Sequence, residues 1–204
     1  LTKSVMAVPA PVMFAHIMIP EHAADHDMQK PPRVYAGTMD AVTRGTSDGL
    51  NIYLGILAVL LVLIAFVTIV NSAVGLLPMV GGEVLTLERI AGWMFAPLAW
   101  LMGMPWSDAL TVGSLVGIKT VLNEFIAYIK LSEIPVSELG ERSRLIATYA
   151  LCGFANISSV GIQIGGIGAM CPERKLDLAQ LALPALVAAT LGSLMAGSIV
   201  SMII

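Results

Sequence analysis

The uncharged stretch GLNIYLGILAVLLVLIAFVTIVNSAVGLLPMVGG, residues 49–82, decides the class of this protein. It exceeds the roughly 20 apolar residues that a helix needs to cross the hydrocarbon core of a bilayer. Further uncharged runs follow at 90–107, 145–172 and 178–204. Charged residues make up 12% of the chain, about half the share that soluble domains carry, and all of them lie outside these four runs. The sequence therefore predicts an all-α polytopic membrane protein.

The composition also argues against several other classes of protein. A net charge of −3 without a dense basic stripe indicates no nucleic-acid partner. Cys152 and Cys171 lie in or beside one apolar run, which favours neither a disulfide framework nor a zinc site. His16, His22 and His26 show no convincing spacing for metal ligands. The sequence has no Walker loop, nucleotide fingerprint or Ser/His/Asp arrangement, so we expect no enzyme activity and no cofactor.

The first 48 residues are interpreted as the end of a broken transmembrane helix, a loop and an interfacial helix. Residues 1–20 are apolar, and Pro9 and Pro11 among them remove backbone donors and favour a bend or break. Because this apolar stretch starts almost at Leu1, we expect an N-terminal part of the protein to be missing. A polar, proline-bearing loop follows, and the small, mixed residues 34–48 favour a short helix at the membrane interface.

Two helices of different kinds are expected next. Residues 49–82 are long enough to form a tilted transmembrane helix. Residues 83–107 contain tryptophans and Pro97, which suits a helix at the membrane boundary. Lysine and arginine are more frequent before the long helix than directly after it, so the loop within 21–48 is predicted to be cytoplasmic.

The segment DALTVGSLVGIKTVLNEFIAYIKL, residues 108–131, is too apolar for a loop, yet its charges leave pieces too short to span a bilayer. We predict a re-entrant hairpin of two half-helices with Asn123 and Glu124 at its polar tip. Irregular backbone at that depth has to be buried in protein or line a cavity. Lys119 either pairs with a carboxylate that holds the hairpin together or extends to the interface, and we favour the structural role.

Residues 143–172 are predicted to form a discontinuous helix. Its apolar first part leads into CGFANISSVGIQIGGIG, residues 152–168, where polar side chains such as Asn156 and Ser159 lie among glycines. Free backbone groups at such a break can bind a polar solute or a cation, whereas the alternative is that the small residues only allow close helix packing. Residues 176–204 are expected to form a final helix with a packing role.

The polar residues at these two breaks indicate a binding site. An ionisable group deep in a membrane segment is costly, which makes Glu124 the strongest functional candidate. A hydroxyl-rich solute supplies the donors that a carboxylate needs, and Asn123, Asn156 and Ser159 offer further polar groups. Two broken elements with polar groups near the midplane are typical of the substrate site of a secondary transporter. The energy for transport would then come from an ion gradient.

Several stretches resemble the concentrative nucleoside transporters, a family of cation-coupled symporters. The most specific are GIKTVLNEFIAYIKL (117–131) and TYALCGFANISSVGIQIGGIGAMCPER (148–174). Supporting matches are LTKSVMAVPA at the start, GTSDGL (45–50) and FAPLAWLMGMPWSDA (95–109). The resemblance covers nearly the whole chain and corresponds to the C-terminal part of that family.

The resemblance implies a transporter fold in a homotrimer, with the helix of 49–82 in a scaffold and 108–204 in a mobile transport domain. The positions that match the family's substrate site would surround a nucleoside, with Glu124 and Asn156 on the ribose hydroxyls, Ser159 beside them, Phe154 against the nucleoside and Asn123 next to the hairpin tip. The expected location is the plasma (inner) membrane, crossed several times.

The resemblance also implies a coupling cation. In sodium-coupled members it lies beside a first hairpin that would precede Leu1, and Ser4 and Val5 match the ligands that this chain would share. The version ISSVGIQIGG (157–166) is more similar to the sodium-coupled branch than to the proton-coupled one. Three alternatives stay open: a proton-coupled nucleoside symporter, a nucleoside-sensing membrane protein of the same fold that does not transport, and a structural role in which the polar residues hold helices together.

Overall fold

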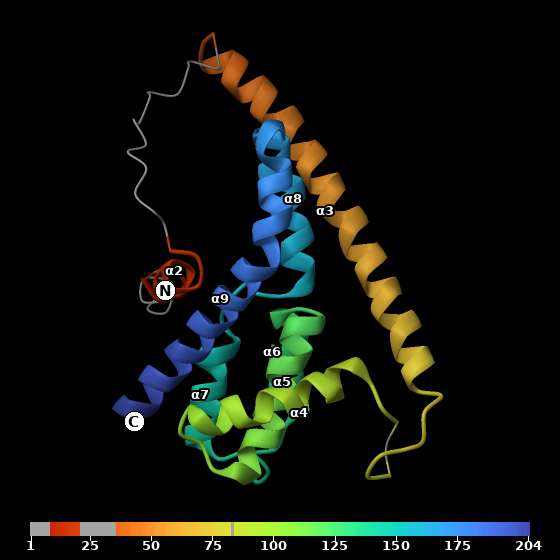
Figure 1. The fold of residues 1–204 in the computed structure, drawn as a ribbon, viewed down its shortest axis with the longest axis vertical. Coiled ribbons are helices and arrows are strands. Elements are labelled where there is room, and N and C mark those ends of the chain that lie inside the picture. The colour runs from red at the N-terminus through yellow and green to blue at the C-terminus, as the bar shows by residue number, and fades with distance from the viewer. Residues whose placement is uncertain (1–8, 21–35, 83) are drawn as a thin grey trace.

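The fold is seen in a computed structural model that describes residues 9–20, 36–82 and 84–204. The described residues form α-helices and one 3₁₀ helix, without strands, which confirms the all-α prediction. The elements in chain order are α2 (Pro9–Met18), α3 (Thr38–Val74), α4 (Leu87–Leu101), α5 (Trp106–Val121), α6 (Glu124–Glu133), α7 (Glu141–Leu151), α8 (Ile157–Met170), η1 (Pro172–Arg174) and α9 (Lys175–Ile203). Figure 1 shows α3 as a long diagonal along one side, with α4 to α7 gathered at one end of the molecule.

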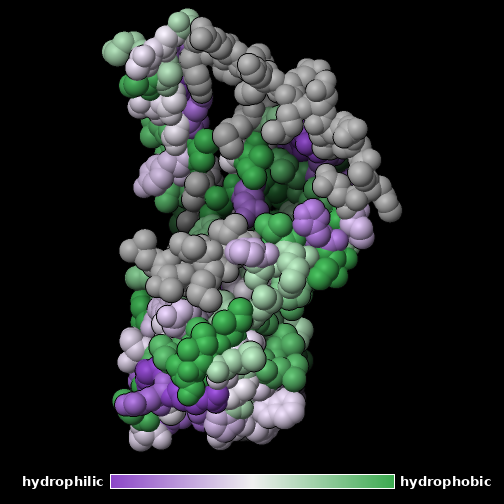
Figure 2. Space-filling view, turned by 90° about the vertical axis from the view of Figure 1, so that its left-hand side faces the viewer, coloured by the Kyte–Doolittle hydropathy of each residue, from purple (hydrophilic) through white to green (hydrophobic). Residues whose placement is uncertain are grey.

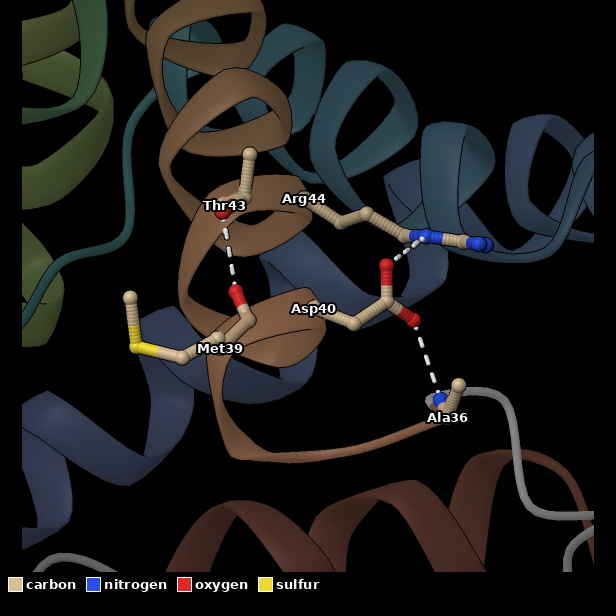
Figure 3. Close-up of polar contacts among 5 residues, drawn as sticks. All are labelled: Ala36, Met39, Asp40, Thr43 and Arg44. Atoms are coloured by element: carbon tan, nitrogen blue, oxygen red, sulfur yellow. Dashed lines mark hydrogen bonds and ion pairs between the residues drawn. The ribbon is translucent and has the colours of Figure 1, made fainter.

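The long helix α3 begins earlier than the sequence predicted. A separate interfacial helix over 34–48 was expected, but one uninterrupted helix runs Thr38–Val74. Its first turn is stabilised by Asp40, whose carboxylate accepts from the Ala36 N–H at 3.0 Å and pairs with Arg44 at 2.7 Å (Figure 3). The prediction was wrong because no proline interrupts this segment, and a glycine inside a helix costs only about 1 kcal/mol.

The long helix also ends earlier than the predicted range 49–82, at Val74. The turn that follows contains the glycines at 81 and 82, whose φ angles of 66° and 82° fall in a region that glycine adopts without steric cost. Near the end of α3, the Asn71 side-chain amide donates to both carboxylate oxygens of Glu88 at 3.0 Å. This contact joins the end of α3 to the first turn of α4.

The two prolines expected to break the first helix lie in the first turn of α2 in the described residues. Pro9 is the first described residue of this helix. Pro11 packs on α9, because a Cβ placed on Gly192 would come within 2.6 Å of the Pro11 Cγ. The predicted part of this helix before Pro9 lies outside the described residues.

Helix α4, within the range expected for an interfacial helix, packs backbone to backbone on α5. A Cβ on Gly113 would lie 2.7 Å from the Ala96 N and the Gly92 O. A Cβ on Gly117 would lie 2.7 Å from the Glu88 O. Only glycine allows this approach, so α4 and the first half of the hairpin form one tightly packed unit.

The predicted hairpin over 108–131 corresponds to α5 and α6, which are separated by a break at Leu122 and Asn123. The two half-helices contact each other, and both contact α7. Their buried side chains form one core with α7, which includes Val112, Leu115, Val116, Ala127, Leu131, Ile146, Ala147 and Leu151. The depth of this hairpin in a bilayer stays a prediction.

The predicted discontinuous helix over 143–172 corresponds to α7 and α8, which are separated by residues 152–156. Of the polar residues expected to interrupt the helix, Asn156 lies at the break, whereas Ser158 and Ser159 lie in the first turn of α8. Helix α9 starts at Lys175, as expected for the final helix, and it contacts α2, α7 and α8.

The surface of the described residues is strongly apolar. Helix α9 is the one fully described helix that is long and apolar enough to cross a membrane, by length and composition. On α3, the side chains of Leu61, Val62 and Phe66 are 70%, 67% and 59% exposed. Figure 2 shows apolar side chains in several patches on one face of the molecule, next to hydrophilic ones. Exposing such area to water costs about 25 cal/mol per Å², whereas lipid tails do not impose this cost.

Candidate substrate site

The tip of the α5–α6 hairpin meets the break between α7 and α8. In Figure 1, α8 begins next to the upper end of α6. The Ser158 hydroxyl, in the first turn of α8, donates to the Leu122 carbonyl at the hairpin tip over 3.5 Å. The N-termini of α6 and α8 and the C-termini of α5 and α7 therefore lie at one place. Helix N-termini carry partial positive charge and C-termini partial negative charge, so the backbone alone gives the site an electrostatic polarity.

Asn156 and Ser159 close the N-terminus of α8 in a capping box. The Asn156 Oδ1 accepts from the Ser159 N–H at 2.7 Å, and the Ser159 Oγ accepts from the Asn156 N–H at 3.1 Å. The Ser159 hydroxyl also donates to the Asn156 carbonyl at 2.6 Å. Both residues are buried, at 1% and 2% exposure. The backbone thus occupies the Ser159 hydroxyl, whereas the Asn156 Nδ2 is directed away from the cap.

Asn123 caps the N-terminus of α6 in a similar way. Its Oδ1 accepts from the Ile126 N–H at 2.9 Å. The next residue, Glu124, is the first of α6 and is partly buried. A carboxylate in the first turn of a helix interacts favourably with the positive end of the helix dipole. The sequence NE at the tip therefore gives α6 both a cap and a charge of the favourable sign.

The carboxylate of Glu124 and the amide of Asn156 come together across the two breaks. The Asn156 Nδ2 donates to the Glu124 Oε2 at 3.1 Å, over a separation of 32 positions in the chain. A carboxylate only accepts hydrogen bonds, whereas an amide both donates and accepts. This pair suits a solute with neighbouring hydroxyl groups, each of which can donate to the carboxylate and accept from the amide.

The other predicted site residues are placed differently. Phe154 lies in the break with its side chain 56% exposed, so its ring is accessible to a ligand. Ser4 and Val5, predicted as sodium ligands, lie outside the described residues, as do His22 and His26. Within 9–20, 36–82 and 84–204, no group of three or more His, Cys, Asp or Glu side chains could hold a metal ion.

Sequence reasoning missed how the hairpin holds the end of α7. Lys119, predicted to pair with a carboxylate or to extend to the interface, is 1% exposed, and its Nζ donates to the Ala150 carbonyl at 3.1 Å. The Tyr128 hydroxyl donates to the Thr148 carbonyl at 2.7 Å. The burial of Lys119 excludes the interface, and one of its partners is a backbone carbonyl. A lysine inside an apolar run was the available signal, but no spacing rule points to a particular carbonyl.

A helical hairpin and a broken helix that present polar groups to each other are typical of the transporter folds with discontinuous helices. The chain belongs to the family described as "Na+ dependent nucleoside transporter C-terminus", whose family model matches residues 1–201. This confirms the family that the motifs around Glu124 and Asn156 indicated.

Relatives and solved structures agree with this assignment. The chain is 38% identical over 210 residues to the transporter YutK of Bacillus subtilis, covering 100% of this chain and 52% of that protein. It is 37% identical to the nucleoside permease NupC of Helicobacter pylori, with 100% and 50% covered, and 36% identical to human solute carrier family 28 member 3, with 98% and 32% covered. A structure of a CNTnw variant in the intermediate 2 state matches with a TM-score of 0.84 at 35% identity, covering 99% of this chain and 50% of that one. The chain thus spans about half the length, or less, of the relatives it matches.

Proposed function

We propose that this chain is the C-terminal part of a symporter that imports nucleosides by alternating access, driven by a cation gradient. The observation that carries the proposal is the hydrogen bond between Glu124 and Asn156 across two broken helical elements. The relative named as nucleoside permease supports the substrate class, and the family described as Na+ dependent supports the coupling. The transporter would not be an enzyme and would need no cofactor besides the coupling cation.

In this proposal the ribose of the nucleoside lies at the meeting point of the two breaks. Its hydroxyls donate to the Glu124 carboxylate and bond the Asn156 amide, with Asn123 and Ser159 holding the helix ends in place. Phe154, exposed beside the break, packs against the nucleoside. The ribose hydroxyls then bond polar atoms of Glu124 and Asn156. Polar atoms left without a partner in a water-poor site would cost free energy.

The remaining parts of the proposal concern the intact transporter. Helix α3 belongs to a scaffold of a homotrimer in the plasma (inner) membrane, and the unit from α5 to α9 moves relative to it. Sodium is the proposed coupling ion, with Ser4 and Val5 among its ligands and protons as the alternative.

The test is concentrative uptake by the full-length protein in proteoliposomes. We expect Glu124→Gln and Asn156→Ala to abolish accumulation of uridine and adenosine, because each removes one partner of the pair that meets the ribose. The matched control is Glu133→Gln at the other end of the same helix, where the carboxylate is exposed and paired with Lys130. It should transport normally.

The oligomeric state of each variant, measured by native mass spectrometry, separates loss of the site from loss of folding. Trimers that no longer take up nucleosides support the proposal. Normal accumulation by either site variant would show that the ribose lies elsewhere. Nucleoside binding without uptake in the unmodified protein would favour the sensor alternative.

A further inference from the structure

The last turn of α7 ends at the break, and its carbonyl groups need donors from outside the helix. The Thr148 carbonyl accepts from the Cys152 N–H at 3.3 Å and from the Tyr128 hydroxyl at 2.7 Å. The Ala150 carbonyl accepts from the Lys119 Nζ at 3.1 Å. Two of these donors, Lys119 and Tyr128, come from the two halves of the hairpin. The hairpin therefore binds the C-terminal end of α7 as well as the N-terminal end of α8.

The Lys119 ammonium lies at the base of the break. A Cβ on Gly153 would come within 3.5 Å of the Lys119 Nζ and would collide with the Ser193 hydroxyl of α9. Lys119 itself is almost fully buried, which is rare for a lysine unless its charge is compensated. Hence the Lys119 ammonium group, the backbone of Gly153 and the Ser193 side chain of α9 lie close together at the break.

The charges of the hairpin match the polarity of the broken helix. Lys119 lies near the C-terminal ends of α5 and α7, where a cation is favoured, and Glu124 lies at the N-terminal ends of α6 and α8, where an anion is favoured. Lys119 and Glu124 lie on the two sides of the hairpin tip, and their partners Ala150 and Asn156 lie on the two sides of the break. A single contact would allow the hairpin tip to rotate relative to the break. Two contacts, one made by a cation and one by an anion, hold the tip and the break in one orientation.

We propose that Lys119, supported by Tyr128, is a positioning residue for the substrate site. By holding the Ala150 carbonyl it fixes the end of α7, and through the short segment 152–156 it fixes the Asn156 amide in front of the Glu124 carboxylate. Lys119 acts without touching the substrate. Only the expected effect on nucleoside affinity rests on the proposed function. The ordering of the break by Lys119 does not depend on any ligand.

The test uses the full-length protein with Lys119→Met, which keeps an unbranched chain and removes the charge. The matched control is Arg142→Met. Arg142 also donates across helices, to the Gly103 carbonyl at 2.5 Å and the Ser201 carbonyl at 2.8 Å, but it lies at the start of α7, away from the break. Three quantities are measured for each variant: equilibrium binding of uridine, melting temperature, and hydrogen–deuterium exchange of peptides that cover residues 148–160.

For Lys119→Met we expect the dissociation constant for uridine to rise about tenfold or more, because the lost hydrogen bond involves a charged donor. Exchange of the amides in 152–156 should become about tenfold faster, since the ends of the break are no longer held. Arg142→Met should lower the melting temperature without changing the dissociation constant for uridine or the exchange rate of 152–156. Tyr128→Phe removes one neutral donor. It should raise the dissociation constant for uridine and the exchange rate of 152–156 as well, but by less.

A Lys119→Met protein with normal exchange at 152–156 and normal affinity would overturn the proposal. Equal effects of Lys119→Met and Arg142→Met, in proportion to their melting temperatures, would overturn it too, because they would indicate general destabilisation. If Lys119→Met does not fold, unchanged exchange at 152–156 and unchanged uridine affinity in Tyr128→Phe would overturn the proposal as well. If the unmodified protein binds no uridine, the proposed function fails, yet the exchange measurement still decides whether Lys119 orders the break.

Discussion

At the scale of single residues, an asparagine caps the helix that starts at the hairpin tip and another caps the helix that starts at the break. Asn123 and Asn156 each cap a helix with the side-chain oxygen, and this fixes the orientation of the side-chain amide group. For Asn156 the fixed amide nitrogen reaches Glu124. Because the cap holds the Asn156 side chain, its amide nitrogen stays directed at Glu124, and the backbone pre-organises the candidate site. The same dependence makes the cap partner Ser159 important for the orientation of the Asn156 amide.

The first prediction concerns Ser159→Ala. The change removes the hydroxyl that accepts from the Asn156 N–H and leaves this N–H buried without its partner, which costs about 1–3 kcal/mol. We expect a lower melting temperature and a moderate, severalfold loss of uridine affinity in the full-length protein. Ser159→Thr, which keeps a hydroxyl, is the control. A loss of affinity as complete as that of Asn156→Ala, at an unchanged melting temperature, would mean instead that the hydroxyl contacts the substrate.

The site residues were predictable from the sequence to different degrees. Glu124 and Asn156 stood out because polar groups within long apolar runs are costly and need a reason. Their hydrogen bond, the capping role of Ser159 and the carbonyl partner of Lys119 were not predictable. They depend on how the hairpin packs against a helix that starts elsewhere in the chain, and Lys119 and Ala150 are 31 positions apart. Charge and hydropathy along a sequence carry no information on such pairings.

At the scale of elements, the breaks were better predicted than the continuous helices. The hairpin and the broken helix were recognised because charges and glycines divide their apolar runs. The start of α3 at Thr38 was missed because the mixed residues after it have the composition of an interfacial segment, while the helix continues through them. Local composition indicates where a helix is interrupted, but a weakly helical segment next to a strong helix is extended by cooperative hydrogen bonding.

The packing of α4 on α5 gives the second prediction. Gly113→Ala places a Cβ 2.7 Å from the backbone of α4, so the helices must separate, at a cost of about 1–3 kcal/mol. We expect a clearly lower melting temperature in detergent. The control is Gly45→Ala in α3, where a Cβ meets no atom within 4 Å and the better helix propensity of alanine should keep or raise stability. Equal melting temperatures of the two variants would contradict the tight packing of α4 and α5.

At the scale of the whole molecule, the apolar surface, the two breaks and the family assignment all indicate a lipid bilayer as the environment. The exposed side chains of α3 and the long apolar helix α9 suit lipid tails, whereas polar groups gather where the breaks meet. A bilayer requires irregular backbone to be covered by protein or to line a cavity, and here the hairpin and α9 cover the end of α7. The candidate site and the fold therefore depend on the same contacts, since polar groups from the hairpin tip and from the α7–α8 break bond one another.

The last prediction concerns the coupling ion of the intact transporter. The family is described as Na+ dependent, which favours sodium as the coupling ion. We expect an inward sodium gradient to drive accumulation of uridine into proteoliposomes and an inward proton gradient at constant sodium to have no effect. An inside-negative potential should increase the sodium-driven rate, because each entering charge gains about 2.3 kcal/mol per 100 mV. Vesicles with choline in place of sodium are the control. Uptake driven by protons alone would keep the site around Glu124 but withdraw Ser4 and Val5 as sodium ligands, whereas no uptake under either gradient would contradict the proposed transport.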